Sequence, residues 1–503
     1  MFSKLFSGIA ESVNPVFIKE MRQYFQNRRM IIFMGVLLLV QFICTLFFSS
    51  AMQFDAYDSS GVGFFLLIIL AGSVLSVIIC AAGAQQRFAE ERSDKELNYS
   101  MLTTLRPSSI IWGKLEGAMV MILCIFSLLL PFLTAAYFMR GLSAASLLFT
   151  LCIFPVLMIY TLAGIFAGAF GNKWITGIFF FALACSTVFL LVASIEIIDD
   201  LMSRGGLDSD FWIAVLVEYE IAFLLGVLLF LLSLAVISPP KSNRFCPVKV
   251  YLFAMPAIAF LLILPYYIAF RNTGFTRDVY FVIEFIFCAC AAVAMTLIAV
   301  CEPPMDSLRV YMKCPRGSLG RFVHFLFSSG FAGTLLLVLP VLAAPIATLP
   351  FSKLSNSERS TICGIMAIPV SFFGYALLSL LLSRIVKLRI PALAWMIILE
   401  IAGNLLGWIP LTLWEGLDFG SRFGGSIPTP LRVSCMEVSH LYCFVEAFES
   451  SRTSWHCYYA LAASVAVAGV LLLAMSPFLF KTFRQHRRPD IEVKPPTKDM
   501  LGK

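Results

Sequence analysis

Residues 91–115 read ERSDKELNYSMLTTLRPSSIIWGKL, and this polar stretch lies between two apolar runs at 62–84 and 116–138. Seven of its residues are charged, although charged residues make up only 13% of the chain. An apolar run of about 20 residues is long enough to cross a ~30 Å hydrocarbon layer as a helix. We therefore predict that the stretch is a loop that connects two membrane-spanning helices on one side of a bilayer.

The rest of the chain repeats this alternation of long apolar runs and polar connections. Of its 503 residues 60% are hydrophobic, and the mean hydropathy is +0.89, whereas soluble domains are about 45–50% apolar. The composition predicts an all-α polytopic membrane protein with about twelve transmembrane helices. The expected spans are 30–50, 62–84, 116–138, 144–170, 174–196, 212–237, 250–270, 279–300, 323–348, 361–383, 391–414 and 457–480.

The distribution of basic residues predicts the orientation, because Lys and Arg collect in cytoplasmic loops. With the N-terminus in the cytoplasm, 28 of the 37 Lys and Arg fall on the cytoplasmic side and 9 on the other. Both termini are thus expected in the cytoplasm. The first apolar run is too long for a signal-peptide core, so we expect a retained anchor. The net charge of +7 suits anionic lipid and gives no indication of nucleic-acid binding.

Two membrane regions of six spans each are expected. The second half has its own polar loop between its second and third spans, CEPPMDSLRVYMKCPRGSLGRFVHF at 301–325. This parallel is consistent with a 6+6 parallel repeat, and a single six-span domain with six accessory spans remains an equal alternative. The expected parts are a cytoplasmic N-terminus at 1–29, a first membrane region at 30–240 with a polar loop at 85–115, a second at 241–480 with an outer loop at 415–456, and a basic cytoplasmic tail at 481–503.

The segment before the first span, NPVFIKEMRQYFQNRR at 14–29, has the pattern of an amphipathic helix. Such a helix lies in the membrane interface, with basic side chains towards lipid headgroups and apolar ones sunk into the bilayer. The apolar face is expected to hold Val16, Phe17, Met21, Tyr24 and Phe25, and the basic face Lys19, Arg22, Arg28 and Arg29.

Within the 91–115 stretch, apolar residues recur at helical spacing at Leu97, Leu102 and Leu105. Pro107 ends that pattern, and the serines that follow are expected to cap a new helix that enters lipid at Gly113-Lys114. The stretch is either an ordinary solvated loop or a docking element for a cytoplasmic partner.

Both segments resemble the type-2 ABC-transporter permeases, the membrane subunits of many bacterial export systems. The resemblance covers about residues 10–140 and includes the Asn-Pro start of the amphipathic helix. Two departures from the family pattern are Lys95-Glu96, where Gly-Thr is usual, and Thr104, where the first Pro is usual. In the loop, the matching residues are Glu91-Arg92, Leu97, Leu102-Thr103, Leu105, Pro107, Ile110 and Gly113-Lys114.

The resemblance implies a transport subunit in a bacterial cytoplasmic (inner) membrane that works with separate ABC ATPase subunits. The chain has no Gly-x-x-x-x-Gly-Lys-[Ser/Thr] loop, so ATP and Mg²⁺ are expected in the partner and no cofactor in this chain. If the chain forms one permease domain, a homodimer or a second permease is expected. The residues expected to dock the ATPase are Glu91, Arg92, Glu96, Leu97, Leu102, Leu105, Pro107, Gly113 and Lys114.

Two further features leave other functions open. Glu400 falls inside the predicted span 391–414 with Asn404 one turn on, as in a substrate or proton pathway or a polar contact between helices. Cys435, Cys443 and Cys457 lie in or beside the outer loop, where one disulfide is expected; their spacing indicates no metal site. The alternatives to an exporter subunit are a membrane-embedded enzyme with an outer-loop site and a proton-coupled secondary transporter that uses Glu400.

Overall fold

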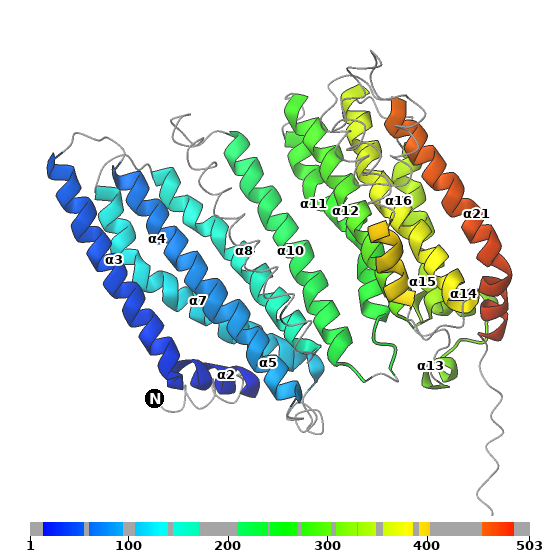
Figure 1. Cartoon of the computed structure of the whole chain (residues 1–503), viewed down its shortest axis with the longest axis horizontal. Helices are drawn as coiled ribbons and strands as arrows, with labels where there is room; N and C mark the ends of the chain where they lie inside the picture. The colour runs from blue at the N-terminus through cyan, green and yellow to red at the C-terminus, as the bar shows by residue number, and fades with distance from the viewer. Residues whose placement is uncertain are drawn as a thin grey trace, which may run out of the picture. The chain divides into compact units, whose positions relative to one another are not determined.

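A computed structural model of the chain describes residues 14–54, 60–93, 106–138, 144–170, 177, 209–239, 242–269, 274–302, 308–328, 330–348, 356–385, 392–402 and 455–486. In these ranges the regular structure is helical, with no strand (Figure 1). Seven helices there are long and apolar enough to cross a membrane, or eight if one bent pair is a single span. An all-helical, multi-pass membrane protein is thus confirmed. The number of twelve spans stays a prediction, because residues 178–208 and 403–454 lie outside the described ranges.

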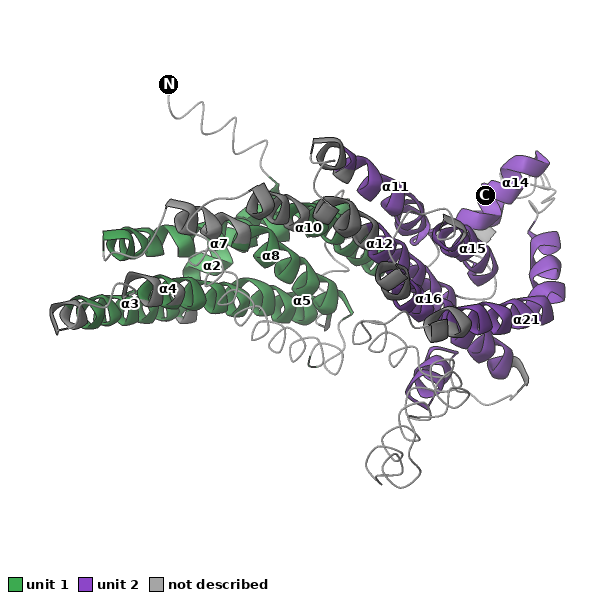
Figure 2. Cartoon of the chain, turned by 90° about the horizontal axis from the view of Figure 1, so that it is seen from above, with its two compact units in different colours: residues 1–238 green, residues 239–503 purple. Residues whose placement is uncertain are grey.

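The chain divides into two compact units, Met1–Ser238 and Pro239–Lys503 (Figure 2). The described helices of the first unit are α2 (Pro15–Gln26), α3 (Arg28–Phe54), α4 (Ser60–Ser76), the π-helical turn η1 (Val77–Ala82), α5 (Gly83–Ser93), α7 (Pro107–Phe138), α8 (Ala144–Ala169) and α10 (Ser209–Ile237). Those of the second unit are α11 (Cys246–Ala269), α12 (Gly274–Cys301), α13 (Leu308–Met312), α14 (Ser318–Phe327), α15 (Phe331–Thr348), α16 (Asn356–Ile385) and α21 (Trp455–Gln485). Residues 392–402 are also helical.

The helices of the two units have the same pattern of neighbours. In the first unit, α3 contacts α4 and α7, α4 contacts α7, α5 contacts α8, α7 contacts α8 and α10, and α8 contacts α10. In the second unit, α11 contacts α12 and α15, α12 contacts α15 and α16, α15 contacts α16 and α21, and α16 contacts α21. Helices α3, α7, α8 and α10 correspond in this pattern to α11, α15, α16 and α21, and α4 with α5 corresponds to α12. Each of these contacts in one unit then has its counterpart in the other.

A short amphipathic helix also contacts the same neighbours in each unit. Helix α2 packs against α3 and α7, and α14 packs against α11 and α15. The chain supplies these two helices at different places, because α2 precedes the first long helix of its unit and α14 precedes the third.

Helices α3 and α21 expose most of their apolar surface. In their most apolar stretches, only 11% and 17% of the residues are buried. Phe47 is 68% exposed and Leu473 is 73% exposed. An apolar surface of this extent is unfavourable in water, so these two helices are suited to contact lipid.

The second predicted span, 62–84, is longer than expected and contains a π-helical turn. Helices α4, η1 and α5 together run from Ser60 to Ser93. Helix α8 approaches this turn closely, because a Cβ atom at Gly164 would fall onto the carbonyl oxygen of Ala81 and one at Gly168 would lie 2.6 Å from that of Gln85. Two glycines four residues apart let helix backbones pack this closely.

The predicted span 323–348 contains a sharp bend, and it is one span only if the bent pair crosses the membrane together. Helix α14 ends at Phe327, α15 begins at Phe331, and the two axes differ by 90°. The carbonyl groups at this corner bind side chains elsewhere in the unit, because Asn243 Nδ2 donates to Phe327 O at 3.2 Å and Lys249 Nζ donates to Ser328 O. These bonds replace the hydrogen bonds that a continuous helix would make.

Two predicted helix ends are corrected. Ser108 and Ser109 do not cap the third long helix, because α7 begins at Pro107, which suits the first helical position since that N–H needs no partner. Gly113 and Lys114 therefore lie inside α7. At the C-terminal side, α21 continues to Gln485, beyond the predicted start of the tail at 481.

Candidate functional site

Helix α2 lies across the lower end of α3 in the view of Figure 1. The start of α2 is set by Asn14, which precedes it, and by Pro15, its first residue. Asn14 Oδ1 accepts a hydrogen bond from the Val16 N–H at 3.1 Å, and Pro15 occupies the first turn. Asn14 Nδ2 also donates to Ser109 O at 2.6 Å, which joins the start of α2 to the first turn of α7.

Two glycines of α7 let α2 pack closely against it. A Cβ atom at Gly113 would lie 2.8 Å from Val16 Cβ, and one at Gly117 would lie 3.0 Å from Glu20 Cβ. Any larger residue at these positions would push the two helices apart. The close approach brings Glu20 within reach of cations on the neighbouring helices.

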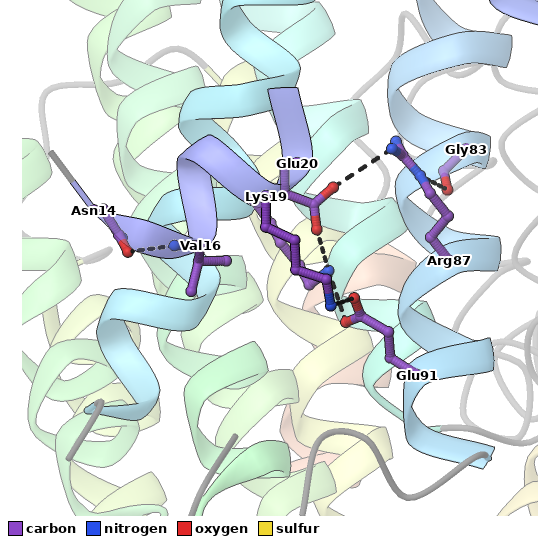
Figure 3. A network of polar contacts seen from close by, with 8 residues as sticks. Asn14, Val16, Lys19, Glu20, Gly83, Arg87 and Glu91 are labelled. Atoms are coloured by element: carbon purple, nitrogen blue, oxygen red, sulfur yellow. Dashed lines mark hydrogen bonds and ion pairs between the residues drawn. The ribbon is translucent and has the colours of Figure 1, made fainter. Parts of the chain in front are cut away.

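Glu20 is the buried centre of a charged network (Figure 3). Its carboxylate lies 2.5 Å from Lys114 Nζ of α7 and 3.4 Å from Arg87 Nη1 of α5. Arg87 is itself held in place, because its Nε donates to Gly83 O at 3.1 Å and its guanidinium lies 3.8 Å from the centre of the Tyr24 ring. Burial raises the pKa of Tyr24, so this phenol stays neutral.

Glu91, near the end of α5, is the second carboxylate of the network. Lys19 Nζ donates to its Oε1 at 2.8 Å, and Lys114 Nζ lies 2.8 Å from its Oε2. Lys114 therefore bridges Glu20 and Glu91. The side chains of Lys114 and Glu20 are only 4% and 3% exposed, so each depends on the other for compensation of its charge.

The network connects both ends of the 94–105 segment, which lies outside the described residues. Glu91 precedes this segment and Lys114 follows it, and both are joined to α2. Arg92 donates to the carbonyl oxygen of Ala169 and so joins the same end of α5 to α8. The two ends of the loop are thus held as one assembly with the amphipathic helix.

The second unit has a buried ion pair at a comparable place in its sequence. Lys249, in the first turn of α11, lies 2.7 Å from the carboxylate of Glu302, directly after α12. Both side chains are fully buried, and Thr334 Oγ1 of α15 donates to Glu302 at 2.6 Å. In both units the glutamate at the end of the second long helix is paired, but in the first unit Glu91 pairs with Lys19 of α2 and Lys114 of α7.

The predicted docking residues divide into two groups. Glu91, Arg92 and Lys114 make contacts within the chain, Gly113 packs against α2, and Pro107 begins α7. The others, Glu96, Leu97, Leu102 and Leu105, lie outside the described residues.

The other predicted sites are only partly covered by the structure. In the amphipathic helix α2, Lys19 pairs with Glu91 and Arg22 is exposed. Arg28 and Arg29 belong instead to α3. Glu400 is half-buried in the helix at 392–402. Cys457 lies within α21. Asn404, Cys435 and Cys443 lie outside the described residues.

Sequence analysis missed Glu20 and Arg87. A signal was present for Glu20, because it is four residues from both Val16 and Tyr24 and so lies on the apolar face of α2. A carboxylate in that position indicates a buried partner. Arg87 carries no comparable signal in its local pattern.

A group of Cys314, His324 and His486 was also missed. Burial, His324 and Arg321 together lower the pKa of His486 to about 4, so its ring is neutral at neutral pH. The residues are far apart in the sequence, and no spacing rule connects them.

Comparison of the chain with models of protein families, with curated proteins and with solved structures found no match.

Proposed function

We propose that the chain is the membrane-spanning permease subunit of an ATP-driven ABC transporter, an exporter, which works with separate ATPase subunits. The docking element is the 94–105 segment, with Glu96, Leu97, Leu102 and Leu105 towards the partner. The observation that carries the proposal is the network of Glu20, Glu91 and Lys114, which ties both ends of this segment to α2. The resemblance of this region to type-2 ABC permeases supports the same assignment.

The network suits a loop that transmits force. A displacement of the 94–105 segment would move the ends of α5 and α7 and the whole of α2 together, because the pairs that join them are buried and costly to separate. Helix α5 continues through η1 into α4. A push at the loop therefore reaches the long helices of the first unit directly.

The same proposal extends to the second unit. Its equal pattern of helix neighbours and its Lys249–Glu302 pair support a 6+6 parallel repeat, with both termini in the cytoplasm. One chain would then provide two docking loops, at 94–105 and within 301–325. The membrane would be the bacterial inner membrane, and one chain would take up two ATPase subunits.

Co-purification from native membranes in mild detergent tests this function. The variant carries Leu97→Ala, Leu102→Ala and Leu105→Ala, and a matched control carries Leu39→Ala, Leu46→Ala and Leu130→Ala, three leucines that are 57–59% exposed on α3 and α7. We expect an ATPase with the intact chain and the control, two copies per chain, and its loss from the loop variant. The function is contradicted if no ATPase accompanies the intact chain, or if the loop variant retains it in full.

A second candidate is a proton-coupled secondary transporter, which the half-buried carboxylate of Glu400 favours. In that case Glu400→Gln would abolish transport, and the loop variant would transport normally. The exporter proposal predicts the opposite result for the loop variant, which would lose transport.

A further inference from the structure

Three metal-ligating side chains of the second unit converge from separate segments. Cys314 lies in the turn after α13, His324 lies in α14, and His486 directly follows α21. One ligand atom from each residue lies within 4.8 Å of the other two. His324 Nδ1 and His486 Nε2 are 2.9 Å apart.

The surroundings of the cluster hold it away from water. Cys314 and His486 are each only 2% exposed, and His324 is half-buried. The His486 ring packs against Tyr311 and Phe325, with ring centres 5.1 and 5.3 Å away. An aromatic shell of this kind limits the access of water to the cluster.

The distances suit a tetrahedral ion after a small adjustment. Zn²⁺ binds imidazole nitrogen at about 2.0–2.1 Å and thiolate sulfur at about 2.3 Å. Ligand atoms around it are therefore roughly 3.3–3.6 Å apart. The two imidazole nitrogens, 2.9 Å apart, would have to separate slightly, and Cys314 Sγ, which lies within 4.8 Å of both, would have to move closer. Among the described contacts, that thiol makes a weak hydrogen bond to Pro315 O at 3.7 Å, which leaves it able to turn towards an ion.

We propose that Cys314, His324 and His486 form a binding site for a divalent transition-metal ion, with Zn²⁺ as the best match to one thiolate and two imidazoles. Three protein ligands leave a fourth position for water or hydroxide. Arg321 lies in the same helix as His324, and its Nε–H is buried without a hydrogen-bond partner among the described residues. An anionic fourth ligand would suit this guanidinium.

A bound ion would connect α14 and the turn after α13 to the end of α21. Without an ion, these segments meet through the His324–His486 contact and through aromatic packing, such as Phe325 against Phe483 at 5.2 Å. The site stands on the geometry of the second unit and does not depend on the proposed transport function.

Metal content and Co²⁺ spectroscopy of the full-length chain in detergent test the proposal. After removal of free metal, the intact chain is expected to hold about one Zn²⁺ and, when Co²⁺ replaces it, to show tetrahedral absorption together with a thiolate-to-cobalt charge-transfer band. That band identifies a Cys ligand in the unaltered protein, so this result does not depend on a variant that folds.

The variants are C314S, H324Q and H486Q, with C301S as the matched control, since Cys301 is a free cysteine of the same unit outside the cluster. Each cluster variant should bind Zn²⁺ at least ~10-fold more weakly, and Zn²⁺ should raise the unfolding temperature of the intact chain and of C301S only. The proposal is overturned if the intact chain takes up no metal, if its Co²⁺ complex lacks the thiolate band, or if C301S loses binding as the cluster variants do.

Discussion

The contacts of α2 with α5 and α7 depend on the carboxylate of Glu20. It is buried between Lys114 and Arg87, and loss of one partner of a buried pair is costly because the other charge stays uncompensated. An apolar contact of the same shape could be equally stable. The network therefore matters more for fixing α2 in one position than for the stability of the chain.

Replacement of Glu20 by Ala is expected to lower the stability of the chain by about 1–3 kcal/mol, because Lys114 and Arg87 would lose the buried carboxylate that they share, while Lys114 would keep Glu91. Arg22→Ala, on the exposed face of the same helix, should change stability by less than about 0.5 kcal/mol. Denaturation of the two variants in detergent compares them. Equal stability of the two would show that the network does not hold α2.

Only part of this site could be predicted from the sequence. Local periodicity predicted an amphipathic helix at 14–29, and the Asn14-Pro15 start is also visible in the sequence. The helix ends at Gln26, so Arg28 and Arg29 of the predicted basic face belong to α3. The partners of Glu20 lie 67 and 94 residues away along the chain, and no local pattern connects them. From the family resemblance, Glu91 and Lys114 were predicted to dock the partner, whereas in the structure they pair with each other.

At the scale of helices, α8 depends on two glycines for its approach to the π-helical turn η1. Gly164 and Gly168 face the carbonyl groups of Ala81 and Gln85. π-helical turns of this kind are frequent at functional sites, and this one joins α4 to the helix that carries Arg87 and Glu91. Any movement of α5 relative to α4 would occur at this turn.

Substitution of Gly164 by Leu is expected to destabilise the first unit by about 1–3 kcal/mol or to abolish its folding, because the side chain would overlap the backbone of η1. Gly35→Leu is the matched control, since a Cβ atom at Gly35 has nothing within 4 Å. Yield of folded protein and unfolding temperature in detergent measure both. A tolerated Gly164→Leu would mean that α8 does not pack on η1 as described.

Helix type was more predictable than helix shape. Apolar length predicted the long helices, but the 90° bend between α14 and α15 coincides with bonds from Asn243 and Lys249 to carbonyl groups 84 and 79 residues away. The π-helical turn likewise has no sequence signal of its own. Both features arise from tertiary contacts, which hydropathy and periodicity do not contain.

At the scale of the molecule, the two units share a pattern of helix neighbours that sequence identity does not reveal. The sequence suggested the repeat only through two polar loops in equivalent positions. The neighbour pattern is stronger support, because it involves every described long helix of both units. Hydropathy predicted a multi-pass membrane protein correctly, and the apolar surfaces of α3 and α21 agree with it.

The most direct test of the docking proposal is a photo-crosslinker placed at position 102 of the full-length chain in native membranes, with position 39 on the exposed side of α3 as the control. The account predicts a specific protein adduct from position 102, and lipid but no protein adduct from position 39. Mass spectrometry should identify the captured polypeptide as an ATPase that contains a Gly-x-x-x-x-Gly-Lys-[Ser/Thr] loop. Capture of lipid alone at position 102, or of a protein without such a loop, would contradict the account.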